Sequence, residues 1–234
     1  MIETRVVDDP AAVCAERLAE SVSRGVHIVL TGGSTPRLCY ERLAGMGLDW
    51  AGTTLWWSDE RCVPPDDENS NYGMVKRALL DRLPPPSEGG PEVRRMRGEE
   101  GPHAGADDYD RELREALGEE LPRLDLALLG LGPDAHVASL FPGQETLRAR
   151  GRAAIGVELA GLEPFVPRIS LTLPVLNAAR SVVFLVTGED KADAVARAFA
   201  GEPSENAPGS LVRPESGDLT LIADAAAAGG LEAD

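Results

Sequence analysis

The chain has 234 residues, of which 43% are hydrophobic and 26% charged, the composition of an ordinary globular protein with a substantial core. Its net charge of −16 argues against a nucleic-acid-binding surface and against an anionic membrane as a partner. Lysine occurs only at Lys76 and Lys191, so arginine must supply most of the positive charge in any site that binds an anion.

Apolar periodicity and chain-breaking residues predict helices and strands that alternate along the chain. In chain order we expect a helix at 10–24, a strand at 26–30, a helix at 36–43, a strand at 53–57, a helix at 71–83, an exposed loop at 84–101 with one short strand at Val93, a helix at 104–117, strands at 124–129, 169–173 and 181–186, a helix at 189–200 and a last strand at 218–222. Continuous apolar strands between helices are typical of a mostly parallel sheet covered on both faces. We therefore predict a single α/β domain spanning residues 1–234.

The N-terminus and the cysteines indicate where the protein works. The polar, acidic segment 1–10 is unlike a signal peptide, and no apolar run approaches the ~20 residues that cross a membrane. Cys14, Cys39 and Cys62 lack the spacing of metal ligands and fit best as small buried thiols in a reducing compartment. We expect a cytoplasmic protein without a bound metal.

A glycine-rich turn, Gly32-Gly33-Ser34-Thr35, follows the first predicted strand. The glycines allow a ligand to approach the backbone closely. Ser34 and Thr35 suit the N-cap of the next helix, and Pro36 suits its first position. The free N–H groups and hydroxyls at such a helix start form a cradle for a phosphate, although an ordinary capped turn has the same pattern.

A cluster of charges, Asp59-Glu60-Arg61, follows the predicted strand that contains two tryptophans. Most such clusters are solvated. This one directly follows a buried strand and precedes a helix that opens at Asn71, so we expect it in a structured turn. The planar guanidinium of Arg61 suits a carboxylate, a phosphate or a developing oxyanion.

The segment 130–143 places Asp134 and His136 two residues apart, after an apolar strand and before an expected helix start. Ligands in α/β folds usually bind at the carboxyl ends of the strands. A lone histidine is often structural, but His27 within a strand and His103 in a loop suit that role better. The segment lacks the third glycine of a dinucleotide-binding fingerprint. His136 is therefore the candidate catalytic base.

Lys191 is expected in the first turn of a helix, where the helix dipole disfavours a cation. With so few lysines in the chain, this placement indicates a bound anion, although an exposed lysine near Glu189 explains it equally well. The sequence has no zinc-ligand spacing, no G-x-S-x-G motif and no P-loop. If the protein is a hydrolase, water is the expected nucleophile and His136 its base.

Several of these segments together resemble the 6-phosphogluconolactonase family. Each motif is weak alone, but they occur in the family's order and span nearly the whole chain. They are LTGGSTP at 30–36, SDERCVPPDDENSN at 58–71, LGLGPDAHVASLFPG at 129–143, RISLTLPVLNAA at 168–179, VTGEDKADAV at 186–195 and PGSLVRP at 208–214. The related glucosamine-6-phosphate deaminases typically carry DEY in the second motif and HIAFNEP in the third, so both motifs favour the lactonase.

The resemblance implies a Rossmann-like α/β fold and hydrolysis of 6-phospho-D-glucono-1,5-lactone to 6-phosphogluconate, the second step of the oxidative pentose phosphate pathway. It implies no required cofactor and a small phosphosugar lactone as the partner. The residues that it implies for binding the substrate and its phosphate are Gly32, Gly33, Ser34, Thr35, Arg168 and Lys191.

The lactone ring would then lie near Asp59, Arg61 and His136. His136 would take a proton from a water that attacks C1, with Asp134 or Asp59 as the carboxylate that orients its ring. Arg61, or backbone N–H groups from Gly132 onward, would stabilise the oxyanion.

Two departures from the family pattern bear on activity. Ala135 stands where the family usually has glycine: alanine is strained by about 1 kcal/mol if this position needs a positive φ, and costs nothing if it is helical. The lysine that often precedes the arginine matching Arg168 is absent from 161–167. Two alternatives stay open: a deaminase or isomerase of amino-sugar phosphates, and a sugar-phosphate sensor without catalysis.

Overall fold

The main sheet in the computed structural model, which describes residues 2–22, 26–118 and 120–231, is entirely parallel. In sheet order its strands are β1 (Ile2–Val6), β10 (Asp218–Ala223), β9 (Ser181–Val186), β6 (Leu126–Leu129), β2 (His27–Leu30), β3 (Thr54–Trp57) and β5 (Glu92–Val93). Every residue of β3, β6 and β9 is buried. Burial on both faces explains why these strands are continuous apolar runs in the sequence.

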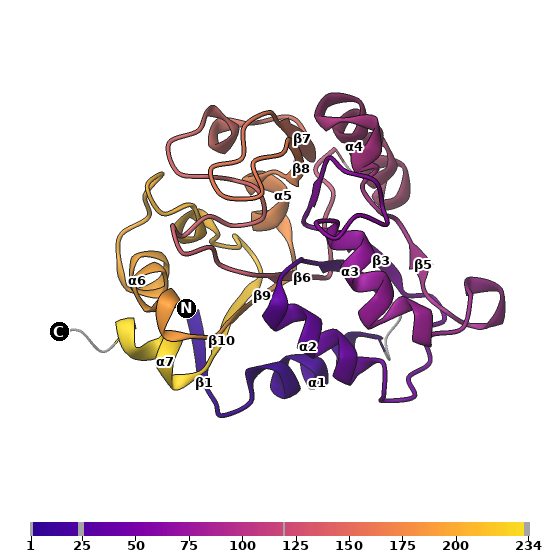
Figure 1. Cartoon of the computed structure of the whole chain (residues 1–234), viewed down its shortest axis with the longest axis horizontal. Coiled ribbons are helices and arrows are strands. Elements are labelled where there is room, and N and C mark those ends of the chain that lie inside the picture. The colour runs from indigo at the N-terminus through magenta and orange to yellow at the C-terminus, as the bar shows by residue number, and fades with distance from the viewer. Residues whose placement is uncertain (1, 23–25, 119, 232–234) are drawn as a thin grey trace.

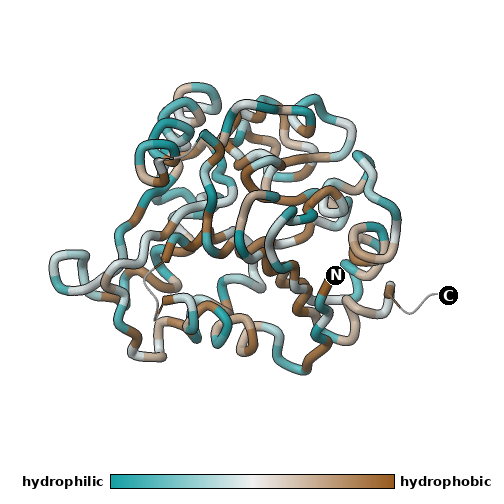
Figure 2. The backbone as a smooth tube through the Cα atoms, turned by 180° about the vertical axis from the view of Figure 1, so that it is seen from behind, coloured by the Kyte–Doolittle hydropathy of each residue, from teal (hydrophilic) through white to brown (hydrophobic). Residues whose placement is uncertain are grey.

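Helices cover both faces of this sheet, and Figure 1 shows α1 and α2 on one side of it and α4 and α5 on the other. The helices are α1 (Pro10–Val22), α2 (Ser34–Leu43), α3 (Asn71–Ala78), α4 (Pro102–Leu117), α5 (Leu173–Ala178), α6 (Ala192–Val195) and α7 (Ala225–Ala228). Short 3-10 turns occupy Leu80–Arg82, Pro86–Glu88, Gly98–Glu100, Glu145–Arg148, Glu189–Lys191, Pro208–Leu211 and Gly229–Leu231, and a π-helical turn spans Ala196–Ala200. Hydrophobic stretches run through the middle of the molecule (Figure 2). Within the described ranges, no helix is long and apolar enough to cross a membrane.

A second, antiparallel sheet contains β4 (Asp59–Arg61), β8 (Arg168–Leu171) and β7 (Ala154–Val157), with β8 in the middle. Its register places Arg61 opposite Arg168. The expected turn at 59–61 is therefore wrong, because these residues pair with β8 as a strand. This pairing places side by side two segments that are more than a hundred residues apart in the chain.

The alternating order of helices and strands is confirmed, and the strand at 181–186 has the predicted bounds. Strand β1, an edge strand with mostly exposed residues, was not predicted, because it lacks an apolar run. Strand β7, whose short sequence contains Gly156, was not predicted either. The predicted helix 71–83 ends as α-helix at Ala78, and residues 23 and 24 of the first predicted helix lie outside the described residues.

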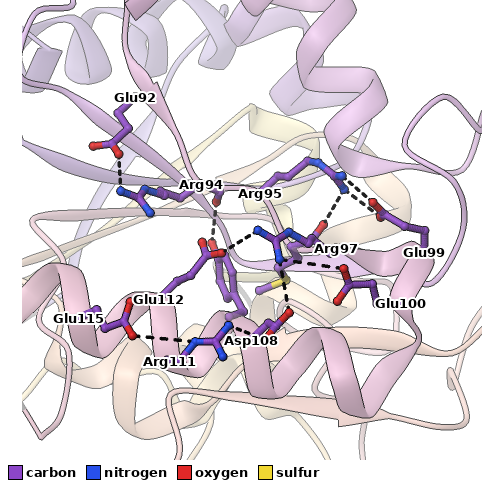
Figure 3. Close-up of polar contacts among 12 residues, drawn as sticks. Glu92, Arg94, Arg95, Arg97, Glu99, Glu100, Asp108, Arg111, Glu112 and Glu115 are labelled. Atoms are coloured by element: carbon purple, nitrogen blue, oxygen red, sulfur yellow. Dashed lines mark hydrogen bonds and ion pairs between the residues drawn. The ribbon is translucent and has the colours of Figure 1, made fainter.

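Helix α4 is joined to the segment 92–100 by ion pairs that Arg97 makes with two carboxylates of the helix (Figure 3). Arg97 lies 3.4 Å from Asp108 and 3.3 Å from Glu112. Exposed pairs of this kind contribute about 1 kcal/mol or less each. The buried hydroxyl of Tyr109 on α4 contributes more to the site, because it accepts a 2.7 Å hydrogen bond from the backbone N–H of Trp57. That bond fixes the end of β3 just before Asp59.

Candidate active site

A cavity of about 230 Å³ lies at the carboxyl ends of β2, β3 and β6, the edge at which parallel α/β sheets bind ligands. A smaller adjoining cavity follows the carboxyl end of β9. Of the residues predicted from the sequence, Gly32, Gly33, Asp59, Arg61, His136, Arg168 and Lys191 line the first cavity, and Gly32, Gly33, Ser34, Thr35 and Lys191 line the second. The topology thus brings together side chains from five separate segments.

Helix α2 begins two residues earlier than expected, at Ser34 directly after the glycine turn. Gly33, at φ 111°, is the N-cap, and Ser34 and Thr35 are already helical, so their predicted capping role is wrong. No side chain caps this helix. Its first N–H groups therefore face the cavity edge as donors, the arrangement in which helix N-termini bind anions.

Asn71, which was expected at the start of a helix, connects this turn to β4. Its side-chain amide donates to the backbone oxygen of Asp59 at 2.9 Å and to Asp59 Oδ1 at 3.3 Å. A Cβ on Gly32 would lie 1.9 Å from Asn71 Oδ1, so only glycine fits there. The buried Asn71 therefore sets the spacing between the glycine turn and Asp59.

Asp59 is almost fully buried and is fixed by hydroxyl donors. Ser139 Oγ donates to Asp59 Oδ2 at 2.7 Å, and Ser58 Oγ donates to Oδ1 at 3.0 Å. Within the described residues, no hydrogen bond joins Asp59 to His136. Asp59 lines the cavity but does not orient the imidazole.

Asp134 is the carboxylate that contacts the histidine. Its Oδ1 lies 2.5 Å from His136 Nδ1 and also accepts the backbone N–H of His136 at 3.1 Å. Burial favours a raised pKa for Asp134, but the hydrogen bonds and charge of His136 outweigh it and hold this pKa below its ordinary value. An ionised carboxylate on Nδ1 fixes the ring so that Nε2 is the nitrogen left for a ligand.

The segment that carries this pair is a tight loop instead of the expected helix start. Gly132 N–H donates to the oxygen of His136 at 2.9 Å, and Ala135 N–H donates back to the oxygen of Gly132 at 2.9 Å. Ala135 has φ 65° and Ala138 has φ 50°, both in the left-handed region that favours glycine. Of the two alternatives for Ala135, the structure therefore has the one with a positive φ and strain. These hydrogen bonds also occupy the Gly132 N–H, which is no longer free to bind an oxyanion.

Two arginines lie side by side at the cavity, on adjacent strands. Arg61 donates to the oxygen of Asn69 at 2.7 Å, and Arg168 donates to the oxygens of Leu162 at 2.9 Å and Pro164 at 3.1 Å. Burial, with the nearby charge of Arg61, lowers the pKa of Arg168.

Neither arginine makes an ion pair with a carboxylate among the described residues, and the buried Nε of each has no hydrogen-bond partner there. Unpaired buried cations are costly, so the pair favours an anionic ligand. Lys191 adds a third cation, because its only ion pair in the described part of the chain is a long 3.9 Å contact with Asp190.

Glu60 belongs to the charge cluster 59–61 of the sequence, but its side chain is buried. It lies on the side of β4 that faces away from the cavity. Its carboxylate accepts the backbone N–H groups of Arg61, Asn71 and Tyr72, each at 2.7 Å. Burial raises its pKa to about 6, against the opposing effect of these hydrogen bonds. Side chains alternate between the two sides of a strand, so residues 59 and 61 face the cavity and residue 60 faces away from it. This alternation could have separated Glu60 from its two neighbours in the sequence.

A Rossmann-like parallel sheet with a cationic cavity at its carboxyl edge defines an α/β protein built to bind an anionic ligand. The family model described as glucosamine-6-phosphate isomerases/6-phosphogluconolactonase matches residues 3–221. The 6-phosphogluconolactonase of Nostoc sp. is 40% identical over 204 residues, which are 86% of this chain and 82% of that protein. The human 6-phosphogluconolactonase is 40% identical over 176 residues, 75% of this chain and 67% of that protein. This chain belongs to the glucosamine-6-phosphate isomerase/6-phosphogluconolactonase family.

Solved structures show the same fold. The 6-phosphogluconolactonase from Trypanosoma cruzi has a TM-score of 0.86 at 28% identity, covering 100% of this chain and 98% of that chain. A monomeric glucosamine-6-phosphate deaminase has a TM-score of 0.79 at 20% identity over 98% of this chain and 99% of that chain, a likeness of fold alone.

Proposed function

We propose that this protein hydrolyses 6-phospho-D-glucono-1,5-lactone to 6-phospho-D-gluconate, with His136 as the base that activates water. The observation that carries the proposal is the 2.5 Å contact of Asp134 with His136 in a cavity that also holds two arginines. An oriented imidazole supplies a base near neutral pH, and the guanidinium groups supply charge for an anionic transition state.

The imidazole is the proton carrier in this mechanism. With Nδ1 directed to Asp134, Nε2 of His136 takes a proton from water while the water oxygen forms a bond to C1 of the lactone. The tetrahedral intermediate then collapses and the bond between C1 and the ring oxygen breaks. The protonated His136 returns its proton to that ring oxygen, the new carboxylic acid releases the second proton of the water to solvent, and the product leaves as a carboxylate.

Arg61 is the proposed donor to the oxyanion on C1. The backbone alternative is weaker, because the N–H groups of Gly132, Ala135 and His136 all donate within their own loop. Arg61 is fixed on β4 by its hydrogen bond to Asn69, so its guanidinium is oriented before the charge develops.

The 6-phosphate is proposed to bind on the start of α2, where the N–H groups of Ser34 and Thr35 accompany the ammonium of Lys191. Arg168, which lies beside Arg61 in the first cavity, is the further cation proposed for the phosphate. Thr35 Oγ1 lies 2.7 Å from Thr187 Oγ1, which fixes its hydroxyl between the carboxyl ends of β2 and β9.

The reaction is the second step of the oxidative pentose phosphate pathway. We place it in the cytoplasm, where reducing conditions keep the three cysteines as free thiols. Because the lactone already reacts with water, one base and one oxyanion site supply enough rate enhancement.

The test is a coupled assay on freshly generated 6-phosphogluconolactone, corrected for spontaneous hydrolysis. We expect activity in the wild type, loss of nearly all of it in His136→Ala, and full activity in the control His103→Ala, whose ring is exposed and paired with Glu158. Full activity in His136→Ala would refute the assignment of the base. Ammonia release from glucosamine 6-phosphate would instead indicate a deaminase, and a thermal shift with phosphosugars but no turnover would indicate a sensor.

A further inference from the structure

The loop that carries Asp134 and His136 cannot keep its shape by local preference. Ala135 and Ala138 both adopt positive φ, and each costs about 1–2 kcal/mol relative to an ordinary backbone conformation. Such residues persist only where the surrounding structure fixes them. The hydrogen bonds within the loop and the contacts from outside it must therefore compensate for the strain together.

Arg197, in the π-helical turn Ala196–Ala200, supplies the main side-chain contact with the start of this loop. Its Nη2 donates to the backbone oxygen of Pro133 at 3.1 Å, and its Nη1 donates to that of Asp134 at 3.4 Å. Its Nε donates to Asp193 at 2.8 Å, which fixes the guanidinium from behind. The backbone oxygen of Ala135 accepts a further hydrogen bond, 2.8 Å long, from Gly209 N–H.

We propose that Arg197 is a positioning residue for the catalytic pair, an inference that rests on the proposed role of His136. The backbone oxygen that Arg197 holds belongs to Asp134 itself, whose carboxylate orients the imidazole. Without this donor, the peptide that follows Asp134 keeps only the hydrogen bond from Ala135 N–H to the oxygen of Gly132 and is held less firmly. Ala135 then relaxes to a negative φ, and the carboxylate leaves Nδ1 of His136. Only a planar fork with several donors reaches both carbonyls and Asp193 together.

A merely structural role for Arg197, as half of an exposed helical ion pair with Asp193, has different consequences. Loss of such a pair changes stability slightly and leaves the turnover of the folded enzyme intact. Loss of a positioning contact lowers kcat with little change in KM. The size of this loss in kcat also depends on the residue at position 135, because glycine adopts the left-handed conformation without strain.

The experiment compares Arg197→Ala with Arg111→Ala, a control that removes exposed ion pairs to Asp108 and Glu115 on α4 (Figure 3). Both variants are also made in an Ala135→Gly background. We expect Arg197→Ala to lower kcat about tenfold at nearly constant KM, and to lower it at most threefold when residue 135 is glycine. In each background, Arg111→Ala is expected to have the same kcat and KM as the protein that keeps Arg111. An unchanged kcat in Arg197→Ala, or an equal loss in both backgrounds, would overturn the proposal.

A second measurement does not depend on turnover. The Nδ1 proton shared by His136 and Asp134 gives a downfield NMR resonance, assigned by its absence in His136→Ala. We expect this resonance to weaken or vanish in Arg197→Ala and to persist in Arg111→Ala. Its persistence in Arg197→Ala would refute the positioning role even if the protein hydrolyses no lactone, whereas absence of lactonase activity in the wild type would refute only the proposed function.

Discussion

Replacing Asp134 by asparagine tests the centre of the proposed mechanism, because it removes a charge while keeping the shape of the side chain. In the wild type, Asp134 Oδ1 accepts from Nδ1 of His136 at 2.5 Å, and this bond strengthens as the imidazole gains a proton in the transition state. A hydrogen bond to a charged group contributes about 1.5–3 kcal/mol. Since 1.4 kcal/mol is a factor of ten in rate, Asp134→Asn is expected to lower kcat by about 10- to 150-fold.

The measurement is kcat and KM in the coupled lactonase assay after subtraction of the spontaneous rate. KM is expected to change little, because Asp134 contacts the base and not the proposed phosphate site. Asp107→Asn is the matched control, since Asp107 pairs with Arg152 at the surface. A kcat within twofold of the wild type in Asp134→Asn, beside an inactive His136→Ala, would show that the carboxylate does not assist the base.

Three further predictions follow from the same contacts. Ala135→Gly is expected to raise the free energy of unfolding in urea by between 0 and about 1.6 kcal/mol, since relief of ~1–2 kcal/mol of strain is offset by the ~0.4–1 kcal/mol entropy cost of glycine; a clear loss would contradict the strain. Lys191→Ala is expected to raise KM at least tenfold, by rough estimate, for the phosphorylated lactone but not for gluconolactone, with Lys76→Ala unchanged; equal effects on both substrates would exclude a phosphate role. Glu60 has a folded pKa of about 6, above its ordinary value of 4.5, so its contribution to stability is present below pH 4.5 and is lost as pH rises through 6. Urea titrations of wild type and Glu60→Gln should therefore show that the free energy of unfolding of the wild type falls by about 2 kcal/mol relative to that of the variant from pH 4.5 to pH 7. A difference that stays constant with pH would refute the raised pKa of Glu60.

The buried strands and their order with the helices could be predicted, because apolar runs such as 181–186 carry the signal of burial on both faces. The edge strand β1 could not, since one side of it faces solvent and its residues are mostly polar. The antiparallel strand β4 was equally hidden, because its three residues gain their structure from Arg168 and its neighbours, more than a hundred positions later. Pairing over such a distance leaves no local pattern.

The candidate site residues could be named from the sequence, but their contacts could not. The choice between Asp59 and Asp134 as the partner of His136 depends on where the hydroxyl of Ser139 and the amide of Asn71 lie, and both donate to Asp59. Those donors satisfy Asp59 away from the imidazole. The role of Arg197 left no sequence signal at all, because it binds backbone oxygens, and any residue can supply those.

The left-handed conformation of Ala135 is strained, but the loop needs it to bring Asp134 and His136 together. The reciprocal hydrogen bonds between Gly132 and the segment 135–136 close a turn of five residues, and that closure requires a left-handed residue at position 135. The turn brings the side chain of Asp134 into contact with His136, two residues further along the chain. In an extended backbone, the two side chains would point to the same side without touching. A Cβ on Gly132 would lie 2.0 Å from His136 Nδ1, so the same closure requires glycine there. A cost of about 1–2 kcal/mol at one alanine is smaller than the ~5–15 kcal/mol free energy of unfolding of a typical domain, so alanine is tolerated at the position.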